Sequence, residues 1–130
     1  MNNILIDSSV WIEYFRGNKN FLFVNDLIVT NVLCTNELIL TELLPFILYK
    51  KEFDLSDLLC SIRKLKMTIN WEELCSFQLI NIKNGNNTVG IPDLMIAQNC
   101  RQNKCKLLSC DKHFRVIAKF LPLEVYNYPI

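Results

Sequence analysis

Residues 4–13 have the sequence Ile4-Leu5-Ile6-Asp7-Ser8-Ser9-Val10-Trp11-Ile12-Glu13. The apolar run 4–6 predicts a short buried strand, which ends at Asp7. Ser8 and Ser9 are good caps for the helix that follows, and Gly17 is positioned to end it. A buried strand that leads directly into a helix is typical of an α/β sheet, where ligands bind beyond the carboxyl ends of the strands. We therefore expect Asp7 at the edge of the sheet where a functional site would be built.

Three more acids occupy comparable positions further along the chain. Asp111 follows the apolar run 106–110 and precedes a helix, and Asp93 opens a helix after Ile91 and Pro92. Glu42 lies within an apolar helical stretch, 38–44. Capping is the simpler interpretation of any one aspartate, because aspartate is favoured at helix starts. Glu42 is harder to explain in this way, since a carboxylate among apolar residues is rarely buried without a partner.

The remaining pattern predicts one α/β domain, 1–130, with a small central parallel sheet flanked by helices and no repeat or linker. Trp11 should pack in the core or in a dimer rather than stack on bases. Asn70 and Glu73 resemble a capping box that opens a helix with Trp71, Leu74 and Cys75 inward. The other expected helices are 21–28, 35–51, 54–65 and 114–120, and the other expected strands are 32–34, 106–110 and 123–126.

Composition narrows the class of protein further. Hydrophobic residues make up 51% of the chain, so a generous core and a partner interface are both open. Six cysteines form no C-x-x-C pair, and Cys60, Cys75 and Cys100 are expected as small core residues. The sequence shows no secretory signal, and no apolar run approaches the ~20 residues that span a bilayer. We expect a cytoplasmic, reduced protein that does not enter the membrane.

Basic residues gather between Arg101 and Lys119, although the net charge of the whole chain is only +1. A basic rim around an acidic centre suits a phosphate-bearing substrate, whereas a solvated helix surface explains the same run without one. Carboxylates drawn together raise one another's pKa unless a cation neutralises them. Mg²⁺ or Mn²⁺ is the matching ion, and it would activate a water for phosphodiester hydrolysis.

Four segments together resemble the PIN-domain ribonucleases, specifically the VapC-type toxins of bacterial toxin–antitoxin pairs. They are residues 4–13, Glu42-Leu43-Leu44, residues 90–97 around Asp93, and residues 107–114 around Asp111. The resemblance runs from Ile4 to about Tyr126, in the family's order. It implies a PIN fold, Mg²⁺- or Mn²⁺-dependent cleavage of an RNA substrate, homodimers, and a cognate antitoxin that blocks the site.

By position, the resemblance makes Asp7, Glu42, Asp93 and Asp111 the catalytic and metal-binding acids. Ser9 matches a hydroxyl residue that supports the first aspartate, and Lys112 and Arg115 are candidate RNA contacts. Glu37 competes with Glu42, but five positions on a helix turn the two side chains about 140° apart. The following Leu43-Leu44 favours Glu42.

The sequence departs from the family's pattern at His113, where relatives often have an acid. A solvent-facing position in the first turn of a helix is the simpler interpretation of this histidine. Two other functions stay open. One is a PIN-fold scaffold that binds RNA or protein without cutting. The other is a haloacid-dehalogenase-like phosphatase that uses Asp7, although its general acid would be expected where Ser9 stands.

Overall fold

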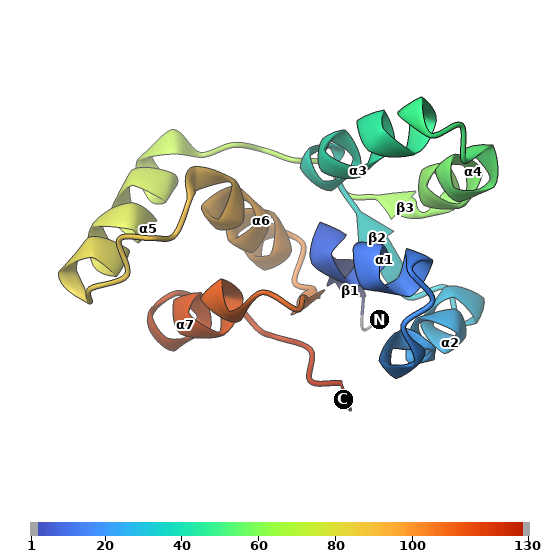
Figure 1. Ribbon diagram of the computed structural model, residues 1–130. Coiled ribbons are helices and arrows are strands. Elements are labelled where there is room, and N and C mark those ends of the chain that lie inside the picture. Colours follow the sequence, from blue (N-terminus) through green and yellow to red (C-terminus); the bar gives the residue numbers. More distant parts are fainter. Residues whose placement is uncertain (1–2, 129–130) are drawn as a thin grey trace.

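The computed structural model describes residues 3–128; residues 1–2 and 129–130, which the expected domain 1–130 includes, lie outside the described part. A small sheet occupies the centre, with helices on both sides (Figure 1). In chain order the elements are β1 (Ile4–Ile6), α1 (Ser8–Phe15), the short 3₁₀ helix η1 (Lys19–Phe21), α2 (Phe23–Val29), β2 (Leu33–Thr35), α3 (Glu37–Tyr49), α4 (Phe53–Ser61), β3 (Arg63–Lys64), α5 (Trp71–Lys83), α6 (Ile91–Gln102), β4 (Lys106–Leu108) and α7 (Lys112–Phe120).

The sheet is parallel, with the strand order β3-β2-β1-β4. The chain therefore moves to one side of β1 to form β2 and β3, and returns to its other side to form β4. Such a reversal of strand order opens a crevice beyond the carboxyl ends of the two strands that flank it, here β1 and β4. Asp7 directly follows β1, and Asp111 lies three residues after the end of β4. The α/β fold with a small parallel sheet is confirmed.

The sheet and the inner faces of the helices enclose one apolar core. The side chains of Leu5, Ile6, Leu107 and Leu108 are fully buried, as parallel strands covered on both faces require. Trp11 is also fully buried and stacks on Phe15, so its assignment to the core is confirmed. This packing fixes α1 beside the end of β1.

The expected helix 54–65 is wrong in its second half. The helix ends at Ser61, Ile62 is extended, and Arg63 and Lys64 form β3 beside β2. The amide of Leu65 donates to the carbonyl of Thr35 at 2.8 Å. The apolar spacing fits a helix, but unpaired backbone groups at the edge of β2 are satisfied only by an extended segment.

The expected strand 123–126 is reduced to a single parallel bridge between Leu107 and Val125. Two hydrogen bonds hold it: the Leu107 amide donates to the Glu124 carbonyl, and the Tyr126 amide donates to the Leu107 carbonyl. The segment turns away after one pairing, which is too short to count as a strand.

Four other expectations about burial and capping have mixed outcomes. Asn70 caps α5 by accepting from the Glu73 amide, but Glu73 binds Arg101 and Gln98 rather than closing a capping box. Trp71, expected inward, is 67% exposed. Cys60 and Cys75 are exposed, whereas Cys100 is buried as expected. Helical spacing identified an apolar face of α5, but no element within residues 3–128 covers much of that face.

Each of the six cysteines is a free thiol. Among residues 3–128, no helix combines the length and apolar character needed to cross a bilayer.

Candidate active site at the carboxyl end of the sheet

Asp7 is held by serine hydroxyls rather than by its own helix. It occupies the N-cap position of α1 without a side-chain capping bond, and it is only 5% exposed. The hydroxyls of Ser9 and Ser109 each donate to Oδ2 of Asp7 at 2.8 Å. Both hydrogen bonds end on the same oxygen, so the carboxylate is oriented while Oδ1 stays free of these two donors. The capping interpretation of Asp7 is therefore wrong.

The same serines join the ends of β1 and β4. The amide of Cys110 donates to the Ser9 hydroxyl, and the amide of Asp111 donates to the Ser109 hydroxyl, each at 3.0 Å. Ser109, which no sequence pattern singled out, thus links Asp7 to the backbone of Asp111. The two acids on either side of the crevice are positioned by one small network.

Asp111 is the N-cap of α7, and Asp93 is the third residue of α6. Oδ1 of Asp111 accepts from the His113 amide at 2.9 Å, so capping is confirmed for Asp111. Asp93 lies in the first turn of α6, and its side chain is 24% exposed. Burial raises the pKa of Asp93, and the negative charges of Asp111 and Asp7 raise it further, while His113 acts in the opposite direction. The charges of two neighbouring aspartates therefore oppose ionisation of Asp93 in the folded protein.

Glu42 completes the acidic group from the opposite side. Its side chain is accessible to water at the rim of a groove between α1 and α3, whose walls include Ile12 and Phe46. Partial burial raises the pKa of Glu42, and the charges of Asp7 and Asp93 raise it further. The competing acid, Glu37, pairs instead with Lys64 at 2.5 Å. The preference for Glu42 over Glu37 agrees with this arrangement.

A buried amide pair fixes the helices that carry Glu42 and Asp93. Nδ2 of Asn36 donates to Oδ1 of Asn99 at 2.9 Å, and Oδ1 of Asn36 caps α3 through the Ile39 amide. Asn99 lies on α6 and also binds the Lys66 carbonyl. Both asparagines are almost fully buried. This contact holds the start of α3 against the C-terminal half of α6.

His113 lies in the first turn of α7 and is partly exposed, which agrees with the simpler interpretation of it, but its ring also lies beside two of the acids. The side chain is 45% exposed, but Nδ1 lies 3.4 Å from Oδ1 of Asp111 and 3.8 Å from Oδ2 of Asp93. Because α7 begins at Lys112, the histidine falls in the first helical turn, beside the acid that caps it. The sequence signal was present in the position two residues after Asp111, where an acid is common in the family that the sequence resembles.

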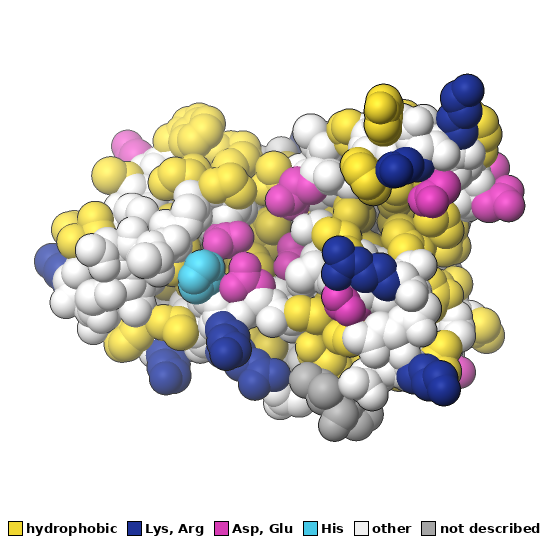
Figure 2. Space-filling model, in the orientation of Figure 1, with side chains coloured by type: hydrophobic (Ala, Val, Ile, Leu, Met, Phe, Trp, Pro, Cys, Tyr) yellow, Lys and Arg dark blue, Asp and Glu magenta, His cyan; other side chains and the backbone are white. Residues whose placement is uncertain are grey.

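The acidic side chains form a group near the middle of one face of the molecule, beside a histidine (Figure 2). Within the described residues, Asp93, Asp111 and His113 can each offer a ligand atom, and these atoms lie within 4.8 Å of one another. Carboxylate oxygens in mutual repulsion are a suitable donor set for a hard divalent cation. The residues therefore fit a divalent metal site.

The basic rim is shorter than the sequence suggested. Lys112 and Arg115 are exposed on α7, close to Asp111 in the chain. Arg101 lies in the last turn of α6 and pairs with Glu73, and Lys106 begins β4, at the opposite end of the strand from Asp111. The basic residues of segment 101–119 therefore do not all lie around the acids, and those nearest to Asp111 in the chain are on α7.

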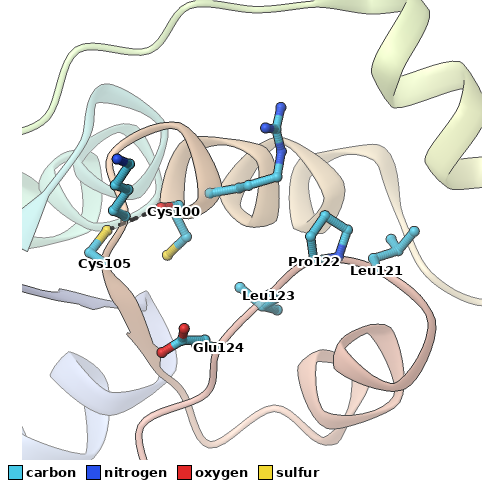
Figure 3. Close-up of a pocket in the computed structure, with 8 residues that line it drawn as sticks. Cys100, Cys105, Leu121, Pro122, Leu123 and Glu124 are labelled. Carbon is cyan, nitrogen blue, oxygen red and sulfur yellow. Dashed lines mark hydrogen bonds between the residues drawn. The ribbon is translucent and has the colours of Figure 1, made fainter.

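A separate pocket of about 510 Å³ lies near the C-terminal end of α6, between Cys100, Cys105 and the segment Leu121–Glu124 (Figure 3). Its lining contains none of the four predicted acids. The thiol of Cys105 contacts the carbonyl of Cys100 at 3.6 Å. This pocket is distinct from the acidic crevice.

The fold and the site together define a class: α/β proteins whose acids gather beyond the carboxyl ends of a parallel sheet, at the reversal of strand order. The sequence identifies the family within that class. The chain belongs to the PIN domain family, whose model matches residues 4–120. The haloacid-dehalogenase alternative is thereby set aside, in agreement with a hydroxyl rather than an acid at Ser9.

Solved structures share this fold. A chain of DNA-bound VapBC from Salmonella typhimurium is 11% identical, with a TM-score of 0.73, over 97% of this chain and 98% of that chain. A chain of VapBC2 from Rickettsia felis, bound to a DNA fragment from its promoter, is 12% identical, with a TM-score of 0.67, over 97% and 98%. PAE2754 from Pyrobaculum aerophilum is 12% identical, with a TM-score of 0.58, over 92% and 87%. No curated protein matches the chain.

Proposed function

We propose that this PIN-domain protein is a divalent-metal-dependent endoribonuclease and the toxin of a VapC-type toxin–antitoxin pair. The observation that carries the proposal is that acids from four separate segments lie near enough to affect one another: the charges of Asp7 and Asp93 act on Glu42, and those of Asp111 and Asp7 act on Asp93. The PIN domain match and the fold shared with the VapBC structures support it. The choice of RNA as substrate rests on the resemblance of the four motifs to the VapC-type ribonucleases.

Each acid has a role in this proposal. Asp7, Asp93 and Asp111 would hold Mg²⁺ or Mn²⁺, with Glu42 at the rim directly or through water. The ion would supply positive charge for the phosphate oxygens and a lowered pKa for the attacking water. Ser9 and Ser109 orient Asp7 before substrate binds, so that the carboxylate would be preorganised for the ion.

Substrate would be held by the basic side of the site. Lys112 and Arg115 project from the helix that Asp111 caps, so their charges lie beside the acids rather than among them. Lysine and arginine bind the phosphates of a strand without reading its sequence. The phosphodiester next to such a contact would then lie over the crevice.

Two exposed apolar surfaces support the proposed protein partners. The groove between α1 and α3 includes Glu42, and exposed Phe46 and Tyr49 continue it along α3, so an antitoxin segment placed there would cover the site. The second surface is on α5 and includes Trp71, Leu79 and Ile82, which suits a second copy of the chain. Apolar patches of this kind mark protein interfaces. A cytoplasmic location, where RNA is available, is part of the same proposal.

The test is cleavage of total RNA by the purified chain with Mg²⁺, with Mn²⁺ and with a chelator. A folded Asp93→Asn variant is the comparison, and Glu37→Gln, which changes an acid paired with Lys64, is the matched control. We expect defined fragments that require metal, disappear in Asp93→Asn and persist in Glu37→Gln. Tight RNA binding without cleavage under any divalent ion would replace the nuclease by the scaffold alternative.

A further inference from the structure

His113 lies where the imidazole can share an ion with two of the acids. Nδ1 is 3.4 Å from Oδ1 of Asp111 and 3.8 Å from Oδ2 of Asp93. Two ligand atoms on opposite sides of one ion lie ~4 Å apart, because metal–ligand bonds to nitrogen and oxygen are ~2.0–2.2 Å long. The observed separations are therefore within the span of a single ion.

The backbone fixes this placement. The His113 amide donates to Oδ1 of Asp111, so the acid that begins α7 also sets the position of His113 in its first turn. The Asp111 amide is held in turn by the Ser109 hydroxyl. The His113 backbone therefore belongs to the same network that orients Asp7, and its ring lies beside Asp111 with nearly half of the side-chain surface open to solvent.

We propose that His113 is a nitrogen ligand of the divalent ion, and that it turns the preference of the site from Mg²⁺ towards Mn²⁺ and softer divalent ions. The inference rests on the proposed metal-dependent function and adds a ligand and an ion selectivity to it. Mg²⁺ is hard and takes oxygen ligands, whereas imidazole suits transition metals such as Zn²⁺, Fe²⁺ and Ni²⁺. Mn²⁺ accepts the carboxylates and, as a transition metal, gains more than Mg²⁺ from the nitrogen.

An ion pair is the competing account of the same distances. A protonated His113 between Asp93 and Asp111 would supply positive charge itself and would compete with a metal ion. The metal-ligand account places an imidazole nitrogen on the ion, whereas the ion-pair account does not. The two accounts also predict opposite effects of removing the imidazole on the affinity for Mn²⁺.

The decisive experiment is pulsed electron paramagnetic resonance of Mn²⁺ bound to the full chain, which detects ¹⁴N coupled to the metal. We expect nitrogen coupling in the parent and its loss in His113→Asp, which supplies an oxygen ligand at the same position. Calorimetric titration with Mn²⁺ and with Mg²⁺ should show the ratio of the two affinities falling about tenfold or more in His113→Asp, toward Mg²⁺. Lys119→Gln, a change at the far end of α7, should alter neither result.

The possible outcomes distinguish failure of this inference from failure of the proposed metal-dependent nuclease function. Mn²⁺ bound without nitrogen coupling, in a parent that cleaves RNA, would overturn the role of His113 and leave the nuclease standing. Tighter Mn²⁺ binding after His113→Asn would favour the ion pair and also overturn it. Failure of the parent to bind any divalent ion would overturn both. Circular dichroism of each variant establishes that it is folded before the comparison.

Discussion

At the scale of the single residue, two serine hydroxyls decide how Asp7 presents its carboxylate. Ser9 and Ser109 donate to the same oxygen, and each also accepts from a backbone amide at the end of β4. Removing either hydroxyl leaves a buried carboxylate with one fewer donor, and hydrogen bonds to charged groups contribute roughly 1.5–3 kcal/mol. Asp7 would then be less well oriented towards the crevice.

Ser109→Ala and Ser9→Ala should each weaken divalent binding and RNA cleavage by about 10-fold or more, the usual effect of losing a residue that orients a ligand. Titration calorimetry and initial cleavage rates measure the two effects. Ser61→Ala removes a hydroxyl that binds only a carbonyl within α4, so it is the matched control and should leave both unchanged. Equal activity of Ser109→Ala and the parent would contradict the role assigned to this network.

The Asp93→Asn variant should be more stable than the parent without divalent ions, but less active. Burial and the charges of Asp111 and Asp7 oppose ionisation of Asp93, so a neutral isostere relieves repulsion in the metal-free protein. We expect Tm without divalent ions to rise by about 3 °C, whereas cleavage falls about 100-fold or more. Differential scanning calorimetry in chelator tests the first effect. A lower Tm in Asp93→Asn would show that the acids are not repelling one another.

Single residues were predicted well where chain position determines their neighbours. Asp7 and Asp111 follow strands, and strands β1 and β4 are adjacent, so the two acids meet at one edge. The contacts of Ser109 with Asp7 and of His113 with Asp93 were not predicted, because they depend on side-chain direction across a strand end and around a first helical turn. No run of residue types specifies such a direction without the packed structure.

At the scale of the element, α7 combines an acid at its start with cations on its exposed side. Lys112 and Arg115 are exposed, while Phe114 and Ile117 anchor the helix in the core. The helix can therefore present charge to a substrate without moving. Its position relative to the crevice is set by the cap at Asp111.

Lys112→Ala and Arg115→Ala should each reduce RNA affinity and the slope of log K against log salt. The slope decreases by about 0.7 for each phosphate of a single strand that the protein no longer neutralises. Binding of a short single-stranded RNA to a folded Asp93→Asn background, measured by fluorescence anisotropy at several salt concentrations, gives both values. Lys104→Ala, beyond the distant end of α6, is the control. Unchanged slopes in both α7 variants would remove this helix from the RNA interface.

Elements were predicted correctly where local pattern and tertiary pairing agree, as in β1, α1 and α3. The segment 54–65 shows why other elements were predicted wrongly. Its apolar residues repeat as in a helix, but Arg63 and Lys64 gain hydrogen bonds to β2 that a helix would forgo. The partner strand lies about thirty residues earlier in the chain, so no local window includes it. The predicted burial of Trp71 was wrong because burial also depends on distant elements, and none in the described part of the chain covers this side chain.

At the scale of the whole molecule, the clustered acids lower the free energy of unfolding of the metal-free protein. The same acids would bind a cation. Folding raises the pKa values of Asp93 and Glu42 above their ordinary values, so the folded state binds protons more tightly than the unfolded state. The free energy of unfolding should therefore decrease as pH rises from the ordinary values near 4 through the raised ones. Other titrating groups add their own pH dependence, so the comparison must isolate these two.

Urea unfolding between pH 4 and pH 8, with the parent beside a variant carrying both Asp93→Asn and Glu42→Gln, makes that comparison. We expect the stability advantage of the variant to be smallest at pH 4 and to grow with pH until both acids are ionised. Saturating Mn²⁺ should reverse the advantage at pH 7, because only the parent keeps its full set of ligands. A difference independent of pH would show that the crevice does not penalise these charges.

The central claim is that water attacks a phosphodiester of RNA at this acidic crevice. The most direct measurement is cleavage of a defined RNA in H₂¹⁸O with Mn²⁺, followed by mass spectrometry of the product ends. The account predicts one ¹⁸O in the new terminal phosphate and no product from Asp93→Asn. A 2′,3′-cyclic phosphate without solvent oxygen would mean attack by the ribose hydroxyl, and it would contradict hydrolysis by water at these four acids.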